Sequence, residues 1–199
     1  MRVGGHSVYA DGACFNAGTR HQLGGIGVFV EDDHPSNMGR CIRDGKITNQ
    51  IMELSAACAG LRVLRDLGLR DLGLRAGTGA GCVLYTDSIY VCNCINKWSP
   101  TWVRNGWRTK NKTPVLNSDV LSEMVALVDA TNARIVRVLR HDRYPGGDDP
   151  STPARSAAHR AGNLAAETLA ARAAAEGARS ACRIRSAAGI NTTELFRGG

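Results

Sequence analysis

Apolar runs predict three short strands at the start of the chain, over residues 7–10, 24–30 and 38–43. Turn-forming stretches at 11–21 and 31–37 separate these strands, and connections this short are typical of an antiparallel meander. The glycines of the second run permit another backbone to approach closely.

A helical pattern begins near Thr48, which is a suitable N-cap. Apolar residues then recur every three or four positions, at Ile51, Leu54, Ala57, Cys58, Leu61 and Leu64. Asn49 and Glu53 share one face of the first turns. The pattern continues into DLGLRDLGLR, a tandem repeat over residues 66–75. A glycine in each unit argues against one continuous helix, so we interpret the repeat as a surface connection without a catalytic role.

An apolar run over residues 82–87 predicts a buried strand that ends on Asp87. An amphipathic helix over 117–130 and another strand over 134–139 follow it. The order strand, helix, strand is typical of parallel strands joined by a crossover. The Pro/Gly/Asp-rich stretch 141–159 predicts a long loop, either functional or disordered.

Length and composition fit one globular domain. The 199 residues allow a domain over 1–176, which includes an alanine-rich helix at 163–175, and a weakly ordered tail over 177–199. No apolar run is long enough to span a membrane, and no secretory signal is visible. We therefore expect an intracellular protein, with its compartment unresolved. Seven scattered cysteines without metal-site spacing predict reduced, mostly buried thiols.

A basic segment over residues 97–114 holds all three tryptophans and no acidic residue. The chain has a net charge of +7, which fits either an ordinary basic surface or a polyanionic partner. Phosphate contacts are expected from Lys97, Arg104, Arg108, Lys110 and Lys112. Trp98 and Trp102 are four positions apart and would share one aromatic face on a helix. The alternative is a core tryptophan cluster with a solvated charged rim.

Three carboxylates could form a metal site. Asp11 follows the first strand, Asp87 ends the central strand and Glu53 lies near the start of the first helix. Mg²⁺ prefers oxygen ligands, and phosphodiester hydrolysis often uses two ions about 4 Å apart. Each residue alone could be an ordinary turn or cap residue. Their joint placement favours a metal-dependent nuclease.

Six stretches over residues 7 to about 172 resemble the catalytic domain of type 1 ribonuclease H, particularly the eukaryotic kind. They are YADGAC, GIGVFVEDDHPSNMG, GKITNQIMEL, VLYTDSIY, WVRNGWRTKNKTPVLN and GNLAAETLA. The resemblance implies an α/β fold with a five-stranded mixed sheet, three antiparallel strands and then two parallel ones, flanked by helices. It also implies hydrolysis of the RNA strand of RNA–DNA hybrids to 5′-phosphate products, with two Mg²⁺ ions or Mn²⁺ as a substitute. We expect a monomer with no membrane partner and no small-molecule cofactor.

The resemblance assigns catalytic roles to four carboxylates. Asp11, Glu53 and Asp87 match the first three of the family. The fourth position is Glu167, where the family carries aspartate. Glutamate can still bind metal, but its extra methylene moves the carboxylate.

The family also has a loop histidine ten residues before the fourth carboxylate, and here that position is Ala157. His141, directly after the last predicted strand, is slightly preferred as its substitute, and His159 is the competitor. Such a histidine can shuttle protons. The third possibility is that neither histidine takes part.

Substrate-binding residues follow from the same resemblance. Asn49 and Gln50 match residues that read the RNA 2′-hydroxyls, which DNA lacks. The pocket for a DNA phosphate is matched by Lys46, Thr48 and Asn117, with lysine where the family usually has arginine. The groove that packs against DNA sugars is matched by Tyr90, Trp98 and Trp102. The basic segment, with Arg104 and Arg108, matches the family's substrate-gripping protrusion.

Two alternatives remain open. Glu167 and the displaced histidine allow a catalytically weakened protein that binds RNA–DNA hybrids. Another member of the same nuclease superfamily, such as an integrase-like strand transferase, is disfavoured by the TNQ and NGW motifs.

Overall fold

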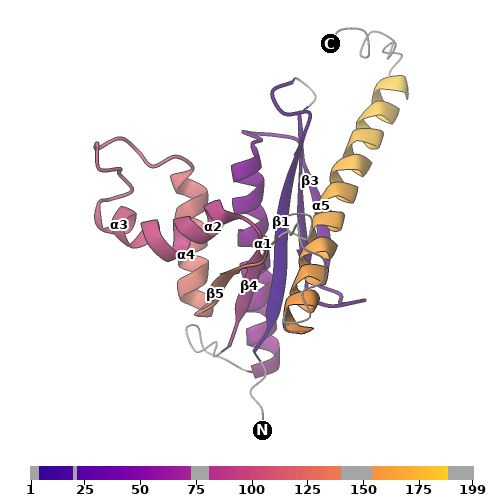
Figure 1. Ribbon diagram of the computed structural model, residues 1–199. Helices are drawn as coiled ribbons and strands as arrows, with labels where there is room; N and C mark the ends of the chain where they lie inside the picture. Colours follow the sequence, from indigo (N-terminus) through magenta and orange to yellow (C-terminus); the bar gives the residue numbers. More distant parts are fainter. Residues whose placement is uncertain (1–4, 20–21, 73–80, 140–153, 188–199) are drawn as a thin grey trace, which may run out of the picture.

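A five-stranded mixed sheet forms the centre of the molecule. The computed structural model describes residues 5–19, 22–72, 81–139 and 154–187 (Figure 1). The strands within them are β1 (Ser7–Phe15), β2 (Leu23–Phe29), β3 (Met38–Ile42), β4 (Val83–Thr86) and β5 (Arg134–Arg137). Their order is β3-β2-β1-β4-β5, with antiparallel pairing among the first three and parallel pairing of β4 with β1 and β5. The predicted fold class is confirmed.

Helices cover both faces of this sheet. The helical elements are α1 (Asn49–Leu72), α2 (Ile89–Asn93), the π-helical turn η1 (Cys94–Trp98), α3 (Ser99–Arg104), α4 (Ser118–Thr131) and α5 (Ala154–Ala187). Helix α1 lies on one face with α4 outside it, and α5 lies on the other face (Figure 1). None of the described helices is both long and apolar enough to cross a membrane.

The two faces are packed differently. Large aliphatic side chains such as Val8, Met52, Leu61 and Leu84 fill the α1 face and are almost fully buried. On the α5 face, Tyr9, Tyr85 and Val138 meet the small side chain of Ala166. The difference follows from the alternation of side chains along β1 and β4, which sends successive residues to opposite faces.

Glycines in β2 let α5 approach the sheet closely. A Cβ atom at Gly27 would lie 2.0 Å from the carbonyl oxygen of Ala166, and one at Gly25 would lie 2.1 Å from that of Ala170. Backbone atoms cannot move away as a flexible side chain can, so these positions require glycine. The close approach predicted for this strand is confirmed.

The structure corrects the expected limits of two elements near the start of the chain. Strand β1 continues through Asp11 to Phe15, where we expected a turn from residue 11, because β2 pairs with it along this whole length. Helix α1 continues through the first DLGLR unit to Leu72. Burial of Leu67 against the molecule offsets the cost of Gly68.

Helix α5 is longer than the predicted alanine-rich helix at both ends. It begins at Ala154, inside the expected loop, and continues to Ala187, inside the expected weakly ordered tail. The C-terminal half is held by packing: the Arg43 guanidinium donates to the carbonyl of Gly177 at 2.6 Å. A Cβ at Gly177 would lie 2.2 Å from Cys41 Sγ. The division at residue 176 stays a prediction, and residues 188–199 lie outside the described part.

Candidate active site

Asp11, Glu53 and Asp87 come together at one edge of the sheet, the one at the C-terminal end of β4 and beside the middle of β1. Each offers a carboxylate oxygen, and these oxygens all lie within 4.8 Å of one another. Asp11 is 1% exposed, whereas Glu53 and Asp87 are half-buried. Three acidic side chains this close repel each other unless a cation lies between them. The cluster therefore has the donor chemistry that a hard divalent cation requires.

Contact between β1 and α1 places Asp11 beside Glu53. A Cβ atom at Gly12 would lie 2.2 Å from the carbonyl carbon of Met52 and 2.4 Å from the Glu53 nitrogen. The two backbones touch here because residue 12 is glycine. Thr48 begins the helix below this contact, since its hydroxyl accepts from the Ile51 N–H at 3.2 Å and acts as the predicted cap.

A pair of short-range hydrogen bonds flanks Asp87. The Ser88 N–H donates to Thr86 Oγ1 at 3.2 Å, and Ser88 Oγ accepts from the Val91 N–H at 3.2 Å. The first bond tightens the end of β4, and the second caps α2. Asp87 lies between Thr86 and Ser88, so these bonds hold its backbone at the end of β4.

Arg137 places a positive charge near this edge. It pairs with Thr86 in the parallel register of β4 and β5, and its side chain is exposed. Burial raises the pKa of the Cys92 thiol, while the nearby Arg137 guanidinium lowers it and Asp87 raises it. Arg137 and Asp87 therefore both lie near Cys92, and the sequence analysis did not single out Arg137.

Glu167 lies on α5 and approaches the site from the other face. It is half-buried and follows Ala166, whose carbonyl faces Gly27, the register partner of Asp11. Within the described residues it is not part of the three-carboxylate cluster. Asn163, one turn earlier, is 4% exposed, and its Oδ1 atom has no hydrogen-bond partner among the described residues. Sequence reasoning missed Asn163, although a polar residue four positions before Glu167 on an apolar helix face was the available signal.

The two candidate histidines have different outcomes. His141 lies outside the described residues, so its role stays a prediction. His159 lies in α5, where its Nδ1 atom is 2.8 Å from the Tyr9 hydroxyl. The centroid of its ring lies 4.2 Å from the centroid of the Tyr85 ring. Among the described residues, His159 does not belong to the cluster formed by Asp11, Glu53 and Asp87.

Tyr90, predicted for the groove, and Asn117, predicted for the phosphate pocket, lie next to each other. Burial and the nearby Cys94 raise the pKa of Tyr90, and a side-chain hydrogen bond with Asn117 lowers it. Asn117 adopts a left-handed conformation with φ of 59° at the start of α4, which asparagine tolerates. Lys46, Asn49 and Gln50 are exposed at the start of α1, where they can reach a ligand.

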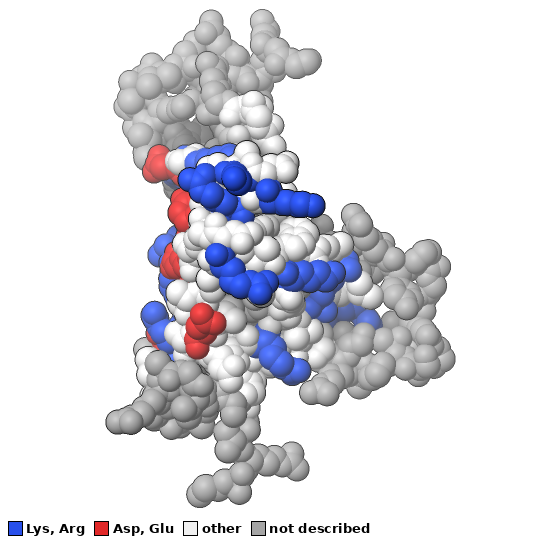
Figure 2. All heavy atoms as spheres, turned by 90° about the vertical axis from the view of Figure 1, so that its left-hand side faces the viewer, with Lys and Arg blue, Asp and Glu red and all other residues white. Residues whose placement is uncertain are grey.

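The basic segment supports both interpretations of its tryptophans. Trp98 and Trp102 lie with ring centroids 5.6 Å apart, and Trp98 is 40% exposed. Trp102 and Trp107 pack against the core instead. Arg104 and Arg108 are exposed. Lysine and arginine side chains spread across this side of the molecule, and acidic ones lie mainly towards one edge (Figure 2).

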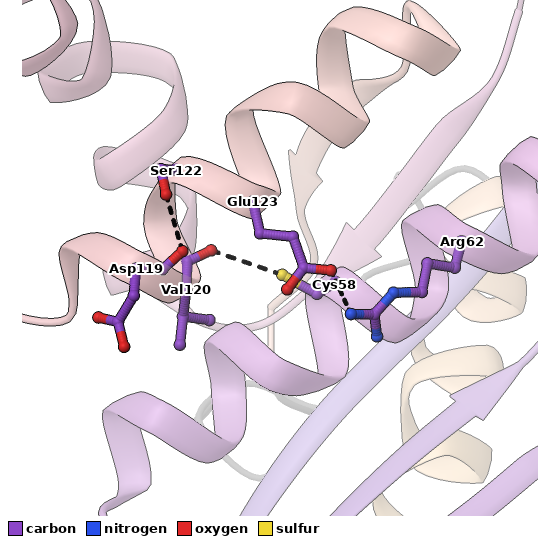
Figure 3. Close-up of polar contacts among 6 residues, drawn as sticks. All are labelled: Cys58, Arg62, Asp119, Val120, Ser122 and Glu123. Carbon is purple, nitrogen blue, oxygen red and sulfur yellow. Dashed lines mark hydrogen bonds and ion pairs between the residues drawn. The ribbon is translucent and has the colours of Figure 1, made fainter.

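Cys58 lies in the contact between α1 and α4, away from the site. Its thiol lies 3.8 Å from the Val120 carbonyl, and beside it Arg62 of α1 pairs with Glu123 of α4 (Figure 3). Burial, with a smaller contribution from Glu123, raises the pKa of Cys58 to about 12, so the thiol is unreactive. Among the described cysteines, Cys58, Cys82 and Cys94 are buried as expected, whereas Cys14, Cys41 and Cys92 are only half-buried, and all six are free thiols.

Sequence comparisons place the chain among known proteins. The family model described as RNase H matches residues 5–175. Ribonuclease H1 of Mus musculus is 31% identical over 151 residues, which is 76% of this chain and 49% of that protein. Ribonuclease H of Clostridium botulinum is 32% identical over 136 residues, or 67% of this chain and 82% of that protein. The chain thus spans about half the length of the mammalian relative.

Solved structures share the fold at lower identity. A foamy viral protease-reverse transcriptase in complex with dsDNA superposes with a TM-score of 0.62 at 19% identity, over 86% of this chain and 95% of that chain. LC9-RNase H1, a type 1 RNase H with the type 2 active-site motif, superposes with a TM-score of 0.58 at 23% identity, over 99% of this chain and 93% of that one. These similarities concern the fold.

Proposed function

The chain belongs to the RNase H family, and from this premise we propose that it is an endonuclease that hydrolyses the RNA strand of RNA–DNA hybrids. The observation that carries the proposal is the Asp11–Glu53–Asp87 cluster, with oxygens within 4.8 Å of one another. The family is metal-dependent, and three clustered carboxylates fit a divalent cation better than any other ligand class.

We propose Mg²⁺ as the natural ion, bound as a pair, with Mn²⁺ as a substitute. When bound, such ions activate water and stabilise the leaving oxygen, giving 5′-phosphate products. Asp11, Glu53 and Asp87 would hold them, and Glu167 would complete the set from α5. Burial of Asp11 keeps bulk water from competing at that carboxylate.

Substrate selection is proposed for the surface around the cluster. Asn49 and Gln50 are exposed one turn before Glu53 and can contact 2′-hydroxyls, which distinguish RNA from DNA. Lys46, Thr48, Asn117, Tyr90, Trp98 and Trp102 would bind the DNA strand through a phosphate and its sugars. The exposed basic segment would add phosphate contacts through Arg104 and Arg108.

The decisive experiment is a cleavage assay on a labelled RNA–DNA hybrid, beside DNA duplex and single-stranded RNA of the same sequence. Asp87→Asn should abolish cleavage and leave hybrid binding measurable, because it removes a metal ligand without touching the groove. Asp119→Asn, which changes an exposed aspartate on α4, is the matched control. Near-normal turnover of Asp87→Asn would show that the metal site is misplaced, and cleavage of DNA duplexes alone would favour a strand transferase.

A hybrid-binding protein with weakened catalysis is the second candidate. The observation that favours it is the position of Glu167, outside the cluster in the described structure. Binding without cleavage in both Mg²⁺ and Mn²⁺ would support this candidate and overturn the first. A monomeric state and an intracellular location stay predictions.

The basic segment can be tested by the salt dependence of hybrid binding. Arg104→Ala and Arg108→Ala should each weaken binding and reduce the slope of log K against log salt by about one. Equal slopes for the variants and the unmodified protein would remove this segment from the interface.

A further inference from the structure

His159 connects α5 to β1, which carries Asp11, and to β4, which Asp87 directly follows. Its Nδ1 atom forms a hydrogen bond of 2.8 Å with the hydroxyl of Tyr9 in β1. Its ring centroid lies 4.2 Å from that of Tyr85 in β4. The rings of Tyr9 and Tyr85 stack with their centroids 5.0 Å apart. One histidine therefore contacts a pair of tyrosines that are register partners across β1 and β4.

The same tyrosines lie close in sequence to Asp11 and Asp87. Tyr9 precedes Asp11 by two residues, and Tyr85 precedes Asp87 by two residues. Side chains two positions apart lie on the same face of a strand, which applies to Tyr9 and Asp11 within β1, while Asp87 follows directly after the last residue of β4. A contact with both tyrosines therefore positions α5 relative to the strand registers from which both aspartates project.

The path of α5 carries this contact towards Glu167. Gly162 lies against the Tyr9 ring so closely that a Cβ atom there would be 2.5 Å from the ring carbons Cε2 and Cζ. Further along, the Ala166 carbonyl faces Gly27, beside Asp11. A rigid helix held at His159, Gly162 and Ala166 has little freedom to shift or rotate at residue 167, the next position.

We propose that His159 is a positioning residue, which docks the N-terminal turns of α5 on Tyr9 and Tyr85 and thereby sets the distance of Glu167 from the Asp11–Asp87 edge. This inference rests on the proposed function, since it concerns the fourth carboxylate of that site. It assigns His159 a role different from the proton transfer considered from the sequence.

Metal binding and catalysis test this role together. Mn²⁺ affinity is measured by calorimetry without substrate, and kcat is measured on the labelled hybrid. Residues that orient metal ligands typically contribute about ten- to a hundredfold to affinity or activity. We expect His159→Ala to weaken Mn²⁺ binding about tenfold and to lower kcat, with KM for the hybrid and the shape of the pH–rate profile unchanged.

Three variants make the test specific. Tyr9→Phe keeps the ring against Gly162 but removes the hydroxyl, so it should change Mn²⁺ affinity in the same direction by a smaller factor. His159→Asn can place a polar atom near the position of Nδ1 and should restore part of the loss. Leu164→Ala changes a side chain on α5 that is 45% exposed, and should leave both quantities unchanged.

A double-mutant cycle shows whether His159 acts through Glu167. In the Glu167→Gln background, His159→Ala should cause no further loss of Mn²⁺ affinity. An equal further loss in that background would overturn the inference. Unchanged Mn²⁺ affinity with a missing limb in the pH–rate profile would also overturn it and would indicate proton transfer.

Failure of the inference can be told from failure of the proposed function. If the unmodified protein neither binds Mn²⁺ nor cleaves the hybrid, the proposed function is wrong and the positioning role is overturned with it. If the unmodified protein binds Mn²⁺ and cleaves the hybrid, and His159→Ala and Tyr9→Phe have the same Mn²⁺ affinity and kcat as the unmodified protein, only the positioning role is wrong. Circular dichroism melting establishes that each variant is folded, and if His159→Ala is not, Tyr9→Phe and His159→Asn decide.

Discussion

The two faces of the sheet hold their helices by different means. Helix α1 is held mainly by hydrophobic volume, through fully buried side chains such as Met52, Leu54 and Leu61, and its backbone touches the sheet at Gly12. Helix α5 is held by close backbone approach, with its carbonyls over Gly25 and Gly27. A face filled by large side chains can absorb small changes in side-chain shape, whereas a face in backbone contact cannot accept one added carbon.

This difference bears directly on the four carboxylates. Glu53 comes from the α1 face and joins Asp11 and Asp87 in one cluster. Glu167 comes from the α5 face, and its position depends on how closely that helix approaches β1 and β2. The candidate site therefore combines a part fixed by the hydrophobic core and the Gly12 contact with a part fixed by the glycine and alanine contacts of α5.

The largest expected effect concerns one carboxylate from each face. Glu53→Gln should lower kcat by about a hundred- to a thousandfold, the size seen when a preorganised electrostatic contact at a reacting centre is lost. Glu167→Gln should lower it less, by about ten- to a hundredfold. Glu167→Asp is the matched variant, since it keeps the charge and shortens the side chain. An equal loss of kcat in Glu53→Gln and Glu167→Gln would mean that the carboxylates from the two faces contribute equally to catalysis.

The backbone contact itself can be broken at Gly27. Gly27→Ala should lower the free energy of unfolding by about 1–3 kcal/mol, because its Cβ would meet the Ala166 carbonyl. Gly68→Ala in α1 meets no atom within 4 Å and should raise stability by about 0.5–1 kcal/mol through helix propensity. Urea denaturation of both variants measures the contrast, and changes of the same sign would contradict it.

The α1–α4 contact predicts a pH dependence of stability. The folded state raises the pKa of Cys58 from its ordinary value of 9.0 to about 12. The unfolded chain therefore releases the thiol proton first, so this contribution to stability is complete below pH 9 and is lost as pH rises towards 12. Between about pH 8 and about pH 10, the unmodified protein should lose more unfolding free energy than Cys58→Ala. Parallel pH curves for the two proteins would contradict this assignment.

The smallest effect is expected for the Arg62–Glu123 pair on the same contact (Figure 3). These side chains are 46% and 45% exposed, and exposed ion pairs contribute little because water and salt screen them. Arg62→Ala should change the free energy of unfolding by no more than about 0.5 kcal/mol, measured at low and high salt. A larger loss would mean that α1 also depends on polar contacts.

Local signals in the sequence were sufficient for the existence of the strands, for the cap at Thr48 and for naming Asp11, Glu53 and Asp87 as carboxylates that could cluster. They were not sufficient for element limits. Asp11 lies inside β1 because β2 pairs beyond it, and α1 continues past Gly68 because packing outweighs propensity. Long-range pairing decided these limits, and no local pattern reports it.

The sequence by itself determined which carboxylates could form a metal site and where the glycines and apolar residues stand, because these are local features of the chain. Only the tertiary structure decided how they are arranged: that Gly12 lets β1 touch α1, and that His159 docks on Tyr9 and Tyr85 within a helix. These contacts join residues far apart in the chain, and their geometry depends on the close packing of two helices on opposite faces of one sheet.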